Sequence, residues 1–466
     1  MAEQRVVVVG GGIAGLTAAW LGSGAAKVTL LEASGRFGGK LLAGEVGGVR
    51  VDLGAESMLA RRPEAVELAR EVGLAGELEP PTTAKAAIWT RGELRPLPGG
   101  QLMGVPGDLA ALAASGVLTA AGVERAGHEG SAEVGSDVAI GAYVAAKLGR
   151  EVVDRLVEPL LGGVYAGHAD EISLRAAVPA LLPVAQAGGS LAAGVRELIG
   201  RPGSGGPVFQ GLRGGLGTLP EAVADACRKN GADLRTDSPV EELSRTPEGW
   251  RIVSNGEVLY ADAVILAVPA PQAARLLAAE VPVAAAELGA VEYAGMALVT
   301  MAFRRADLGT ELSGSGFLVP PVDGRQIKAS TFSSNKWGWL ERSAPDAFLL
   351  RTSLGRHREE AALELADEEL VARSLADLAE AVGLRAKPYD SAVTRWAGGL
   401  PQYPVGHLDR VARIRATVAG VGGLAVCGAA YDGVGVPACI ASARRAVNEV
   451  LTPGAGAAVT EGRMGA

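Results

Sequence analysis

The stretch Arg5–Lys40 reads RVVVVGGGIAGLTAAWLGSGAAKVTLLEASGRFGGK and decides the fold. Its β-branched run Arg5–Val9 is too short for a helix and is typical of a buried parallel strand. The pattern G-x-G-x-x-G follows at once, and its glycines are Gly10, Gly12 and Gly15. A helix is expected from Leu16 to Gly22, and a second strand from Lys27 to Leu31. This order of strand, glycine turn, helix and strand predicts a Rossmann-like α/β unit.

Each feature of this unit has a physical role in holding a dinucleotide. Gly10 permits the tight turn, Gly12 lets the backbone approach a pyrophosphate, and Gly15 lets helix and strand pack closely. The pyrophosphate lies at the helix N-terminus, and Glu32, which ends the second strand, accepts hydrogen bonds from ribose hydroxyls. A carboxylate at that position repels a 2′-phosphate, so NADP is disfavoured. The stretch therefore predicts dinucleotide binding, although the glycine motif alone is a weak signal in a chain with 66 glycines.

Length and composition bound the class of protein. A chain of 466 residues is too long for one core, so two or three domains are expected. The net charge of -8 argues against a nucleic-acid surface. The three cysteines, Cys227, Cys427 and Cys439, lack metal-ligand spacing, and their odd number suits a reducing cytoplasm. No signal peptide is expected before the first strand, and prolines and glycines interrupt the longest uncharged window, 176–195. A soluble cytoplasmic protein is predicted, and peripheral membrane contact stays open.

The rest of the chain changes character along its length. From about Pro98 to Pro207, Ala- and Leu-rich segments broken by Gly and Pro predict a mostly helical insertion. Strand-like segments then predict an antiparallel sheet, namely Val291–Phe303, Gly316–Val319, Gln326–Phe332 and Phe348–Leu354. An acidic amphipathic helix is expected at Glu359–Val382. The strand Leu424–Gly428, a glycine turn and a helix from Cys439 to Leu451 repeat the logic of the first motif.

Side chains suited to acid–base or metal chemistry are scarce. The chain has four histidines, and its sequence has no H-E-x-x-H, C-x-x-C or G-x-S-x-G pattern. His407 is expected to cap a turn in a loop of turn-forming residues. A dinucleotide site without such side chains indicates that the cofactor performs the chemistry. No catalytic side chain and no metal site are therefore predicted.

Several segments together carry a resemblance to a known family. The opening VVVVGGGIAGLTAA and the following LLEASGRFGGK are similar to the flavoprotein amine oxidase and phytoene desaturase superfamily, which binds FAD. Further segments are Asp52–Ser57, Leu97–Gly100 with Met103–Pro106, Glu158–Gly167, Arg395–Trp396 with Leu400–His407, and Cys427–Pro437. In this order, over nearly the whole chain, they resemble the oxygen-dependent porphyrinogen oxidases of haem biosynthesis. The resemblance is strongest to the soluble Gram-positive type that acts on coproporphyrinogen III.

The resemblance implies FAD as the cofactor and implies that distant parts of the chain meet on it. The implied contacts are Gly10, Gly12, Ile13, Ala14, Gly15, Glu32, Ala33, Arg36, Gly38, Gly39, Lys40, Gly54, Ala55, Glu56, Ser57, Val240, Ala267, Trp396, Gly428, Val434, Gly435 and Val436. Arg36 and Lys40 would meet phosphates, and Val240 would flank the adenine. The C-terminal glycine segment would lie along the ribityl chain and the flavin ring.

The resemblance also implies a tetrapyrrole substrate and oxygen as partners. Gly163 matches a position whose backbone faces the tetrapyrrole, and Arg62 matches a basic position near the entrance. The expected substrate contacts are Arg62, Lys85, Gly163, Val164, Phe317, Leu318 and Lys328. Phe317 and Leu318 are equally well explained as core residues. Flavin N5 would take a hydride from a bridging carbon in three rounds, with release of hydrogen peroxide, and a handover of product to a ferrochelatase is a further expectation.

Coproporphyrinogen III is the expected substrate because it carries four propionates, whereas protoporphyrinogen IX carries two. Several cations would then have to line the rim, and the candidates are Arg61, Arg62, Lys85, Arg95, Lys328 and Lys336. Family members that oxidise protoporphyrinogen commonly have an arginine where this chain has Ala84 followed by Lys85. This departure leaves protoporphyrinogen IX open as the alternative substrate.

The expected fold class is α/β, with a discontinuous Rossmann-like FAD-binding domain, an α+β antiparallel-sheet substrate domain and a mostly helical insertion. The expected ranges are 1–56, 208–283 and 388–451 for the FAD-binding domain, 57–97 and 284–387 for the substrate domain, 98–207 for the insertion and 452–466 for a disordered tail. An amine oxidase or carotenoid desaturase is the rival within the superfamily, and a non-enzymatic carrier is the rival outside it. The aromatic content of 4% disfavours an aromatic cage for an amine, and the second glycine segment disfavours a carrier.

Overall fold

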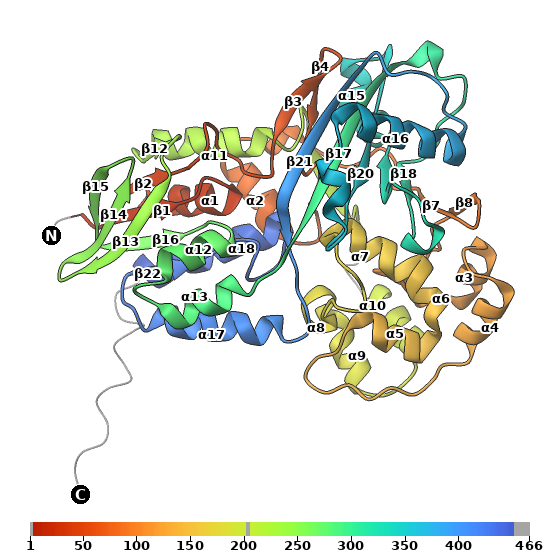
Figure 1. Ribbon diagram of the computed structural model, residues 1–466, viewed down its shortest axis with the longest axis horizontal. Helices are drawn as coiled ribbons and strands as arrows, with labels where there is room; N and C mark the ends of the chain where they lie inside the picture. The colour runs from red at the N-terminus through yellow and green to blue at the C-terminus, as the bar shows by residue number, and fades with distance from the viewer. Residues whose placement is uncertain (1–2, 202–205, 452–466) are drawn as a thin grey trace, which may run out of the picture.

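The computed structural model describes residues 3–201 and 206–451, so the predicted disordered tail, 452–466, lies outside the described residues. The chain has three parts (Figure 1). A parallel sheet covered by helices lies on the left, a long twisted sheet lies at the upper right, and a group of helices lies below that sheet. The predicted α/β class with a second sheet and a helical insertion is confirmed. The division into domains at particular residues stays a prediction.

The parallel sheet is assembled from three distant parts of the chain. Its strands, in spatial order, are β12 (Asp233–Arg235), β2 (Lys27–Leu31), β1 (Arg5–Val9), β16 (Ala263–Leu266) and β22 (Leu424–Val426). Val7 of β1 lies beside Thr29 on one side and beside Val264 on the other. The first strand is therefore the centre of the sheet, and every residue of it after Arg5 is buried.

Helices and strands cover both faces of this sheet, as a parallel sheet requires. One face packs against α1 (Ile13–Gly22), α11 (Thr218–Lys229) and α18 (Val436–Leu451). The other face packs against α12 (Ala270–Leu277), α13 (Pro282–Gly289), α17 (His407–Ala419) and the antiparallel strands β13 (Val240–Thr246), β14 (Gly249–Ser254) and β15 (Glu257–Ala261). Val6 and Val8 belong to the first layer, and Val7 and Val9 belong to the second. The side-chain alternation of a single strand thus separates two cores.

The second sheet has seven strands. In spatial order they are β21 (Asp390–Pro401), β17 (Tyr293–Arg304), β20 (Ala347–Leu354), β19 (Ala329–Thr331), β18 (Gly316–Leu318), β7 (Ala86–Thr90) and β8 (Glu93–Pro96). Its neighbours are antiparallel, as predicted, except that β18 and β7 are parallel. The exception arises because the hairpin of β7 and β8 comes from a much earlier part of the chain and adds to the edge of the sheet.

The acidic helix expected at Glu359–Val382 begins later than predicted. The segment contains a 3₁₀ turn, η6 (Glu360–Glu364), followed by α16 (Asp367–Val382). Arg395 explains the break, because its guanidinium donates to the carbonyls of Leu363 at 2.9 Å and Leu365 at 2.6 Å. A continuous helix would use those carbonyls for its own hydrogen bonds.

Strand β21 was not expected from the sequence. It pairs with β17 from Tyr293 to Ala302, with a register shift between Ala294 and Met296. Gly398, in the left-handed region at φ 57°, lies in the same irregular stretch, which hides the alternation of a strand. The boundary predicted at residue 388 therefore separates β21 from the sheet to which the structure assigns it.

The third part is helical, as the sequence predicts. It contains α3 (Leu109–Ser115), α4 (Ala120–Gly127), α5 (Ile140–Leu148), α6 (Arg150–Val152), the π-helical turn η2 (Val153–Val157), α7 (Glu158–Tyr165), α8 (Leu174–Ala177), η3 (Pro179–Leu181), α9 (Leu182–Gln186) and α10 (Leu191–Ile199). The wide turn η2 ends two residues before Pro159, which has no N–H and whose ring excludes the carbonyl four residues before it. The π turn thus lets one helix run from α6 to the end of α7.

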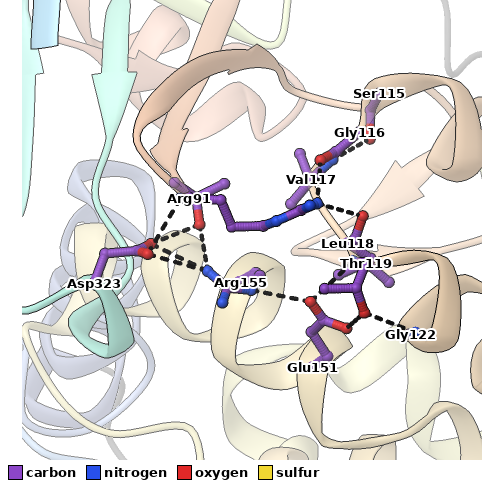
Figure 2. Close-up of polar contacts among 11 residues, drawn as sticks. Arg91, Ser115, Gly116, Val117, Leu118, Thr119, Gly122, Glu151, Arg155 and Asp323 are labelled. Atoms are coloured by element: carbon purple, nitrogen blue, oxygen red, sulfur yellow. Dashed lines mark hydrogen bonds and ion pairs between the residues drawn. The ribbon is translucent and has the colours of Figure 1, made fainter.

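A polar network joins the helical part to the second sheet (Figure 2). Arg155 of η2 donates to Asp323 at 3.2 Å and to the hydroxyl of Thr90 at 2.5 Å. The Nε of Arg155 donates to Glu151 at 3.1 Å, and Glu151 accepts from the hydroxyl of Thr119 at 2.7 Å. Since Asp323 lies between β18 and β19, the network fixes α6 and α4 against the strands that face them.

The remaining elements are short. They are β3 (Ala43–Val46), β4 (Val49–Asp52), β5 (Met58–Leu59), α2 (Pro63–Glu71), η1 (Ala75–Glu77), β6 (Leu78–Glu79), β9 (Gln101–Leu102), β10 (Val105–Pro106), β11 (Phe209–Leu212), η4 (Arg305–Asp307), η5 (Pro321–Asp323), α14 (Ser333–Lys336) and α15 (Gly338–Ser343). Among the described residues, no helix has the length and apolar character needed to cross a membrane.

Candidate functional site

The glycine turn after β1 leaves an open space at one position and none at two others. Gly10 has φ 104°, and a Cβ there would lie 2.6 Å from the carbonyl oxygen of Ala267. A Cβ on Gly15 would lie 1.8 Å from the carbonyl oxygen of Gly10. A Cβ on Gly12 would meet no protein atom within 4 Å. The first two glycines therefore serve the packing of the turn, and Gly12 leaves room for a ligand at the N-terminus of α1.

Glu32 organises the loop beside this turn. One of its carboxylate oxygens accepts from the Gly11 N–H at 2.6 Å, and the other accepts from the N–H and hydroxyl of Ser34 at 2.8 and 2.6 Å. The Ser238 N–H donates to the carbonyl oxygen of Glu32 at 2.8 Å, which brings the segment before Val240 alongside. The carboxylate keeps further lone pairs and is only half-buried, so it can still accept from hydroxyl groups of a ligand.

The second glycine pair packs directly on the first turn. The Gly38 N–H donates to the Gly11 carbonyl at 2.8 Å, and a Cβ on Gly39 would lie 3.2 Å from the Cα of Gly12. Arg36 donates to the Gly39 carbonyl at 2.8 Å, so its guanidinium holds this turn. Lys40 keeps contact with solvent although many protein atoms surround it, and this desolvation lowers the pKa of its ammonium.

The predicted segment Gly54–Ser57 is held mainly by its backbone. A Cβ on Gly54 would lie 2.0 Å from the Lys40 carbonyl oxygen, and the Ala55 N–H donates to the same oxygen at 3.1 Å. Trp396 donates from Nε1 to the carbonyl of Leu53 at 3.2 Å. The predicted residues of this segment and Trp396 therefore do lie together, beside Lys40.

The Glu56 side chain is committed to protein cations, which the sequence did not show. Its carboxylate lies 2.6 Å from Lys336 Nζ and 3.3 Å from Arg351 Nε, and the residue is 6% exposed. Burial would raise the pKa of this carboxyl, but the charges of Arg351 and Lys336 outweigh it and lower the pKa to about 2. The Glu56 carboxylate is thus paired with protein cations, and its contact with the cofactor stays a prediction.

The C-terminal glycine segment is held by an aromatic pair, Tyr403 and His407, whose contact with this segment was not predicted from the sequence. The Gly433 N–H donates to the hydroxyl of Tyr403 at 2.8 Å, and that hydroxyl donates to the carbonyl of Ala429. His407 stacks on the Tyr403 ring with centroids 4.0 Å apart, and its Nε2 lies 3.0 Å from the Ala430 carbonyl. The only signal in the sequence is the position of both residues in the stretch 400–407.

The sequence predicts that His407 caps a loop, and this prediction is wrong. His407 lies buried at the start of α17 with 1% exposure. Burial lowers the pKa of its imidazole to about 4, so the ring is neutral at physiological pH. Since the Ala430 carbonyl can only accept, the tautomer must carry its proton on Nε2. The imidazole therefore supports the backbone of the glycine segment.

The N-terminal and C-terminal segments meet at one edge of the parallel sheet. Helix α1 follows β1, helix α18 follows β22, and the two helices pack against each other. The buried thiol of Cys439, in the first turn of α18, has its pKa raised by burial to about 11, and the charges of Lys40 and Arg62 oppose this rise. A Cβ on Gly428 would, like one on Gly12, meet no protein atom within 4 Å. The carboxyl edge of the parallel strands thus carries two helix N-termini and two open glycine positions, as an extended dinucleotide requires.

Of the predicted substrate residues, Gly163 and Leu318 are brought together. A Cβ on Gly163 would lie 3.8 Å from Leu318 Cδ2, so α7 faces β18 at this point. Val164 is 40% exposed beside them. Phe317 points to the other face of β18, where it is 2% exposed and its ring centroid lies 6.1 Å from that of Trp89. Phe317 is therefore a core residue, and its side chain does not join this wall.

The predicted cations are spread more widely. Lys328 is buried just before β19, where its carbonyl accepts from the Val319 N–H at 2.9 Å. Arg62 pairs with Glu64 at 2.6 Å before α2. Lys85 is exposed, and its carbonyl accepts from the Ser315 N–H at 2.8 Å. Lys328 is thus the predicted cation that lies next to the wall of Gly163 and Leu318.

A glycine–helix element near each end of the chain, both converging on one sheet edge, defines a dinucleotide-binding protein. The family model of the flavin-containing amine oxidoreductases matches residues 13–451, and the chain belongs to this family. It is an FAD-dependent enzyme, and the open positions at Gly12 and Gly428 fit that cofactor.

Proteins similar to this chain include porphyrinogen oxidases, the group to which the chain belongs. The chain is 40% identical to the coproporphyrinogen III oxidase of Mycobacterium tuberculosis, over 97% of this chain and 98% of that protein. It is 31% identical to the coproporphyrinogen III oxidase of Bacillus subtilis, over 97% and 98%. A crystal structure from Exiguobacterium, assigned as a protoporphyrinogen oxidase, matches with a TM-score of 0.86 and 33% identity, over 97% of this chain and 99% of that chain.

Proposed function

We propose that this chain oxidises coproporphyrinogen III to coproporphyrin III in a six-electron reaction. Three molecules of oxygen would be reduced to three molecules of hydrogen peroxide in each full conversion. The observation that carries the proposal is the wall of Gly163 and Leu318, next to the buried Lys328, in a flavin-binding chain. The names and near-complete coverage of the relatives support the same substrate.

The chain's own residues would hold FAD rather than perform chemistry. Bound FAD would accept a hydride from a bridging carbon of the substrate and pass the electrons to oxygen. Gly12 and the N-terminus of α1 would bind the pyrophosphate, and Glu32 would accept from the adenosine ribose. Tyr403 and His407 would keep the backbone of the glycine segment 428–436 in place beside the flavin.

Each of the four imidazoles has a polar contact with another part of the protein. His168 Nδ1 lies 3.2 Å from Glu158, and this hydrogen bond raises the pKa of His168 to about 9. His357 Nε2 lies 2.9 Å from Glu292, and His128 Nδ1 lies 2.9 Å from the Glu124 carbonyl. With His407 turned toward the flavin segment, the chain would contribute binding, orientation and exclusion of water.

The substrate would lie between α7 and β18. Gly163, Val164 and Leu318 offer backbone and aliphatic surface to a flat tetrapyrrole, while cations at the rim would meet its acidic groups. Protoporphyrinogen IX is the second candidate substrate, favoured by the assignment of the Exiguobacterium structure. The two candidates differ in the number of carboxylates that the rim must meet.

Anaerobic stopped-flow spectroscopy tests this function directly. Adding coproporphyrinogen III to the oxidised holoenzyme should bleach the flavin absorbance, and oxygen should restore it. A primary amine and a carotenoid precursor, tested in the same way, should leave the flavin oxidised. Bleaching by an amine but not by the porphyrinogen would contradict the proposal. A comparison of kcat/KM for both porphyrinogens then decides between them, with equal values contradicting a preference.

We place the enzyme in the cytoplasm, where it would deliver its product to a ferrochelatase. The support for a reducing compartment is chemical, since Cys227, Cys427 and Cys439 are free and buried. Fractionation of cells at low and high salt would test both this location and peripheral membrane contact, because a salt-released membrane fraction would contradict a purely cytoplasmic enzyme.

A further inference from the structure

Two cations are buried together where the helical part meets the second sheet. Lys328, just before β19, is 6% exposed, and Arg356, just after β20, is 7% exposed. Val319 links them, since its N–H donates to the Lys328 carbonyl at 2.9 Å and its carbonyl accepts from Arg356 Nη2 at 3.3 Å. Burial and the charge of Arg356 lower the pKa of Lys328 to about 7.

The Lys328 ammonium has no hydrogen-bond partner within the described parts of the chain. The equally buried Lys147, in contrast, donates to the Gly189 carbonyl at 3.0 Å and lies 3.4 Å from Glu129. A buried ammonium without an acceptor is costly, so a native protein keeps one chiefly where a ligand completes it. The unpartnered Lys328 therefore points to an acidic group that the protein does not supply.

Glu158, an acid of the helical part that acts on Arg356, already has protein partners. Burial lowers the pKa of Arg356, and the charges of Glu359 and Glu158 oppose that change, so both acids lie within electrostatic reach of Arg356. The Glu158 carboxylate, however, accepts from the Ala169 N–H at 2.6 Å and lies 3.2 Å from His168 Nδ1. It acts on Arg356 through space and leaves Lys328 without an anion.

The pair adjoins the proposed substrate wall on both sides. Leu318, which faces Gly163, directly precedes Val319 in the chain. On the other side, the His357 N–H donates to the Ala166 carbonyl at 2.7 Å, so Arg356 is held against the end of α7. Lys328 lies opposite Val319 in the ladder that pairs Leu318 with Ala329, so the rim of a tetrapyrrole between α7 and β18 would have to pass the end of β18 to reach these two cations.

We propose that Lys328 and Arg356 form a subsite that binds one carboxylate of the tetrapyrrole and helps to select the acidic substrate. This inference rests on the proposed function and deepens it, because it names the residues that recognise an acidic group. An ammonium and a guanidinium side by side suit a carboxylate, since charge-assisted hydrogen bonds are the stronger kind. The carboxylate would also neutralise the buried charge of Lys328.

The test measures binding of redox-inert porphyrins to the oxidised holoenzyme by Soret absorbance and porphyrin fluorescence. Lys328→Met should weaken binding of coproporphyrin III, which has four carboxylates, by about 10- to 100-fold, the range expected for a lost charged hydrogen bond. It should leave binding of the uncharged coproporphyrin tetraamide within twofold. Arg356→Gln should act in the same direction, and Lys328→Arg should restore part of the affinity.

Exposed Lys387 supplies the control, because Lys387→Met removes one positive charge away from these contacts. Lys328→Met removes an unpartnered buried charge, so the variant should melt at the wild-type temperature or above it. Unchanged coproporphyrin III binding in folded Lys328→Met and Arg356→Gln variants would overturn the subsite. So would an equal loss for the acid and the amide. Failure of the proposed function can be distinguished from failure of the subsite. In that case porphyrinogen would not reduce the flavin of the wild-type enzyme.

Discussion

Removing the hydroxyl of Tyr403 tests the flavin site directly, because this hydroxyl makes two hydrogen bonds to the glycine segment. Tyr403→Phe keeps the ring that stacks on His407 and removes only the oxygen that accepts from the Gly433 N–H and donates to the Ala429 carbonyl. Tyr403 is 1% exposed, so water cannot replace that oxygen without opening the turn. In the Tyr403→Phe variant, the turn would be ordered only when FAD binds.

The expected loss follows from those two bonds. A net contribution of about 0.5–1.5 kcal/mol for each gives about 1–3 kcal/mol, or a rise of about 5- to 150-fold in the Kd for FAD. Fluorescence titration of the apoprotein with FAD measures this change. Tyr389→Phe is the matched control, because its exposed hydroxyl donates to the Gly47 carbonyl at 3.1 Å and not to the glycine segment. A Kd within twofold of wild type for Tyr403→Phe would refute the reasoning.

Three further predictions test the site and its supports. Gly12→Ala should lower FAD loading in absorbance spectra without changing the melting temperature of the apoprotein, whereas Gly15→Ala should lower that temperature, because only at Gly15 would the methyl group meet backbone, at 1.8 Å. Lys336→Met should destabilise the fold by about 3 kcal/mol in urea titrations at pH 7. In the wild type, the lowered pKa of Glu56, about 2, adds stability at neutral pH that is lost as the pH falls from about 4.5 toward 2. Lys336→Met should therefore also make the free energy of unfolding depend less on pH over that range. Asp323→Asn should lower the urea midpoint by an amount equal to about 1–3 kcal/mol, and an unchanged midpoint would contradict a supporting role for the network in Figure 2.

The nucleotide unit could be predicted from the sequence alone because its determinants are local. A β-branched run makes a strand, a left-handed turn needs Gly10, and helix–strand contact needs Gly15, whatever the rest of the chain does. The same local logic predicts the strand and helix at the C-terminal end. Because one dinucleotide must contact both units, they are expected to share one sheet edge. This expectation also follows without knowledge of the tertiary structure.

Partners and faces, in contrast, were decided by residues far apart in the chain. Leu318 and Phe317 are neighbours, yet the pleat of β18 puts one toward Gly163 and the other against Trp89. The sequence predicts that Glu56 contacts the cofactor, whereas the fold pairs its carboxylate with Lys336 and Arg351.

Tyr403 and Lys328 are two further residues whose roles depend on contacts that the local sequence does not encode. The role of Tyr403 depends on a hydroxyl meeting the backbone of Ala429 and Gly433, and nothing in the local sequence encodes that distance. The significance of Lys328 depends on a partner that is missing, which only a buried position in the folded chain can show. Secondary structure and glycine turns follow from interactions between near neighbours, whereas hydrogen-bond partners, ion pairs and burial are set by long-range packing.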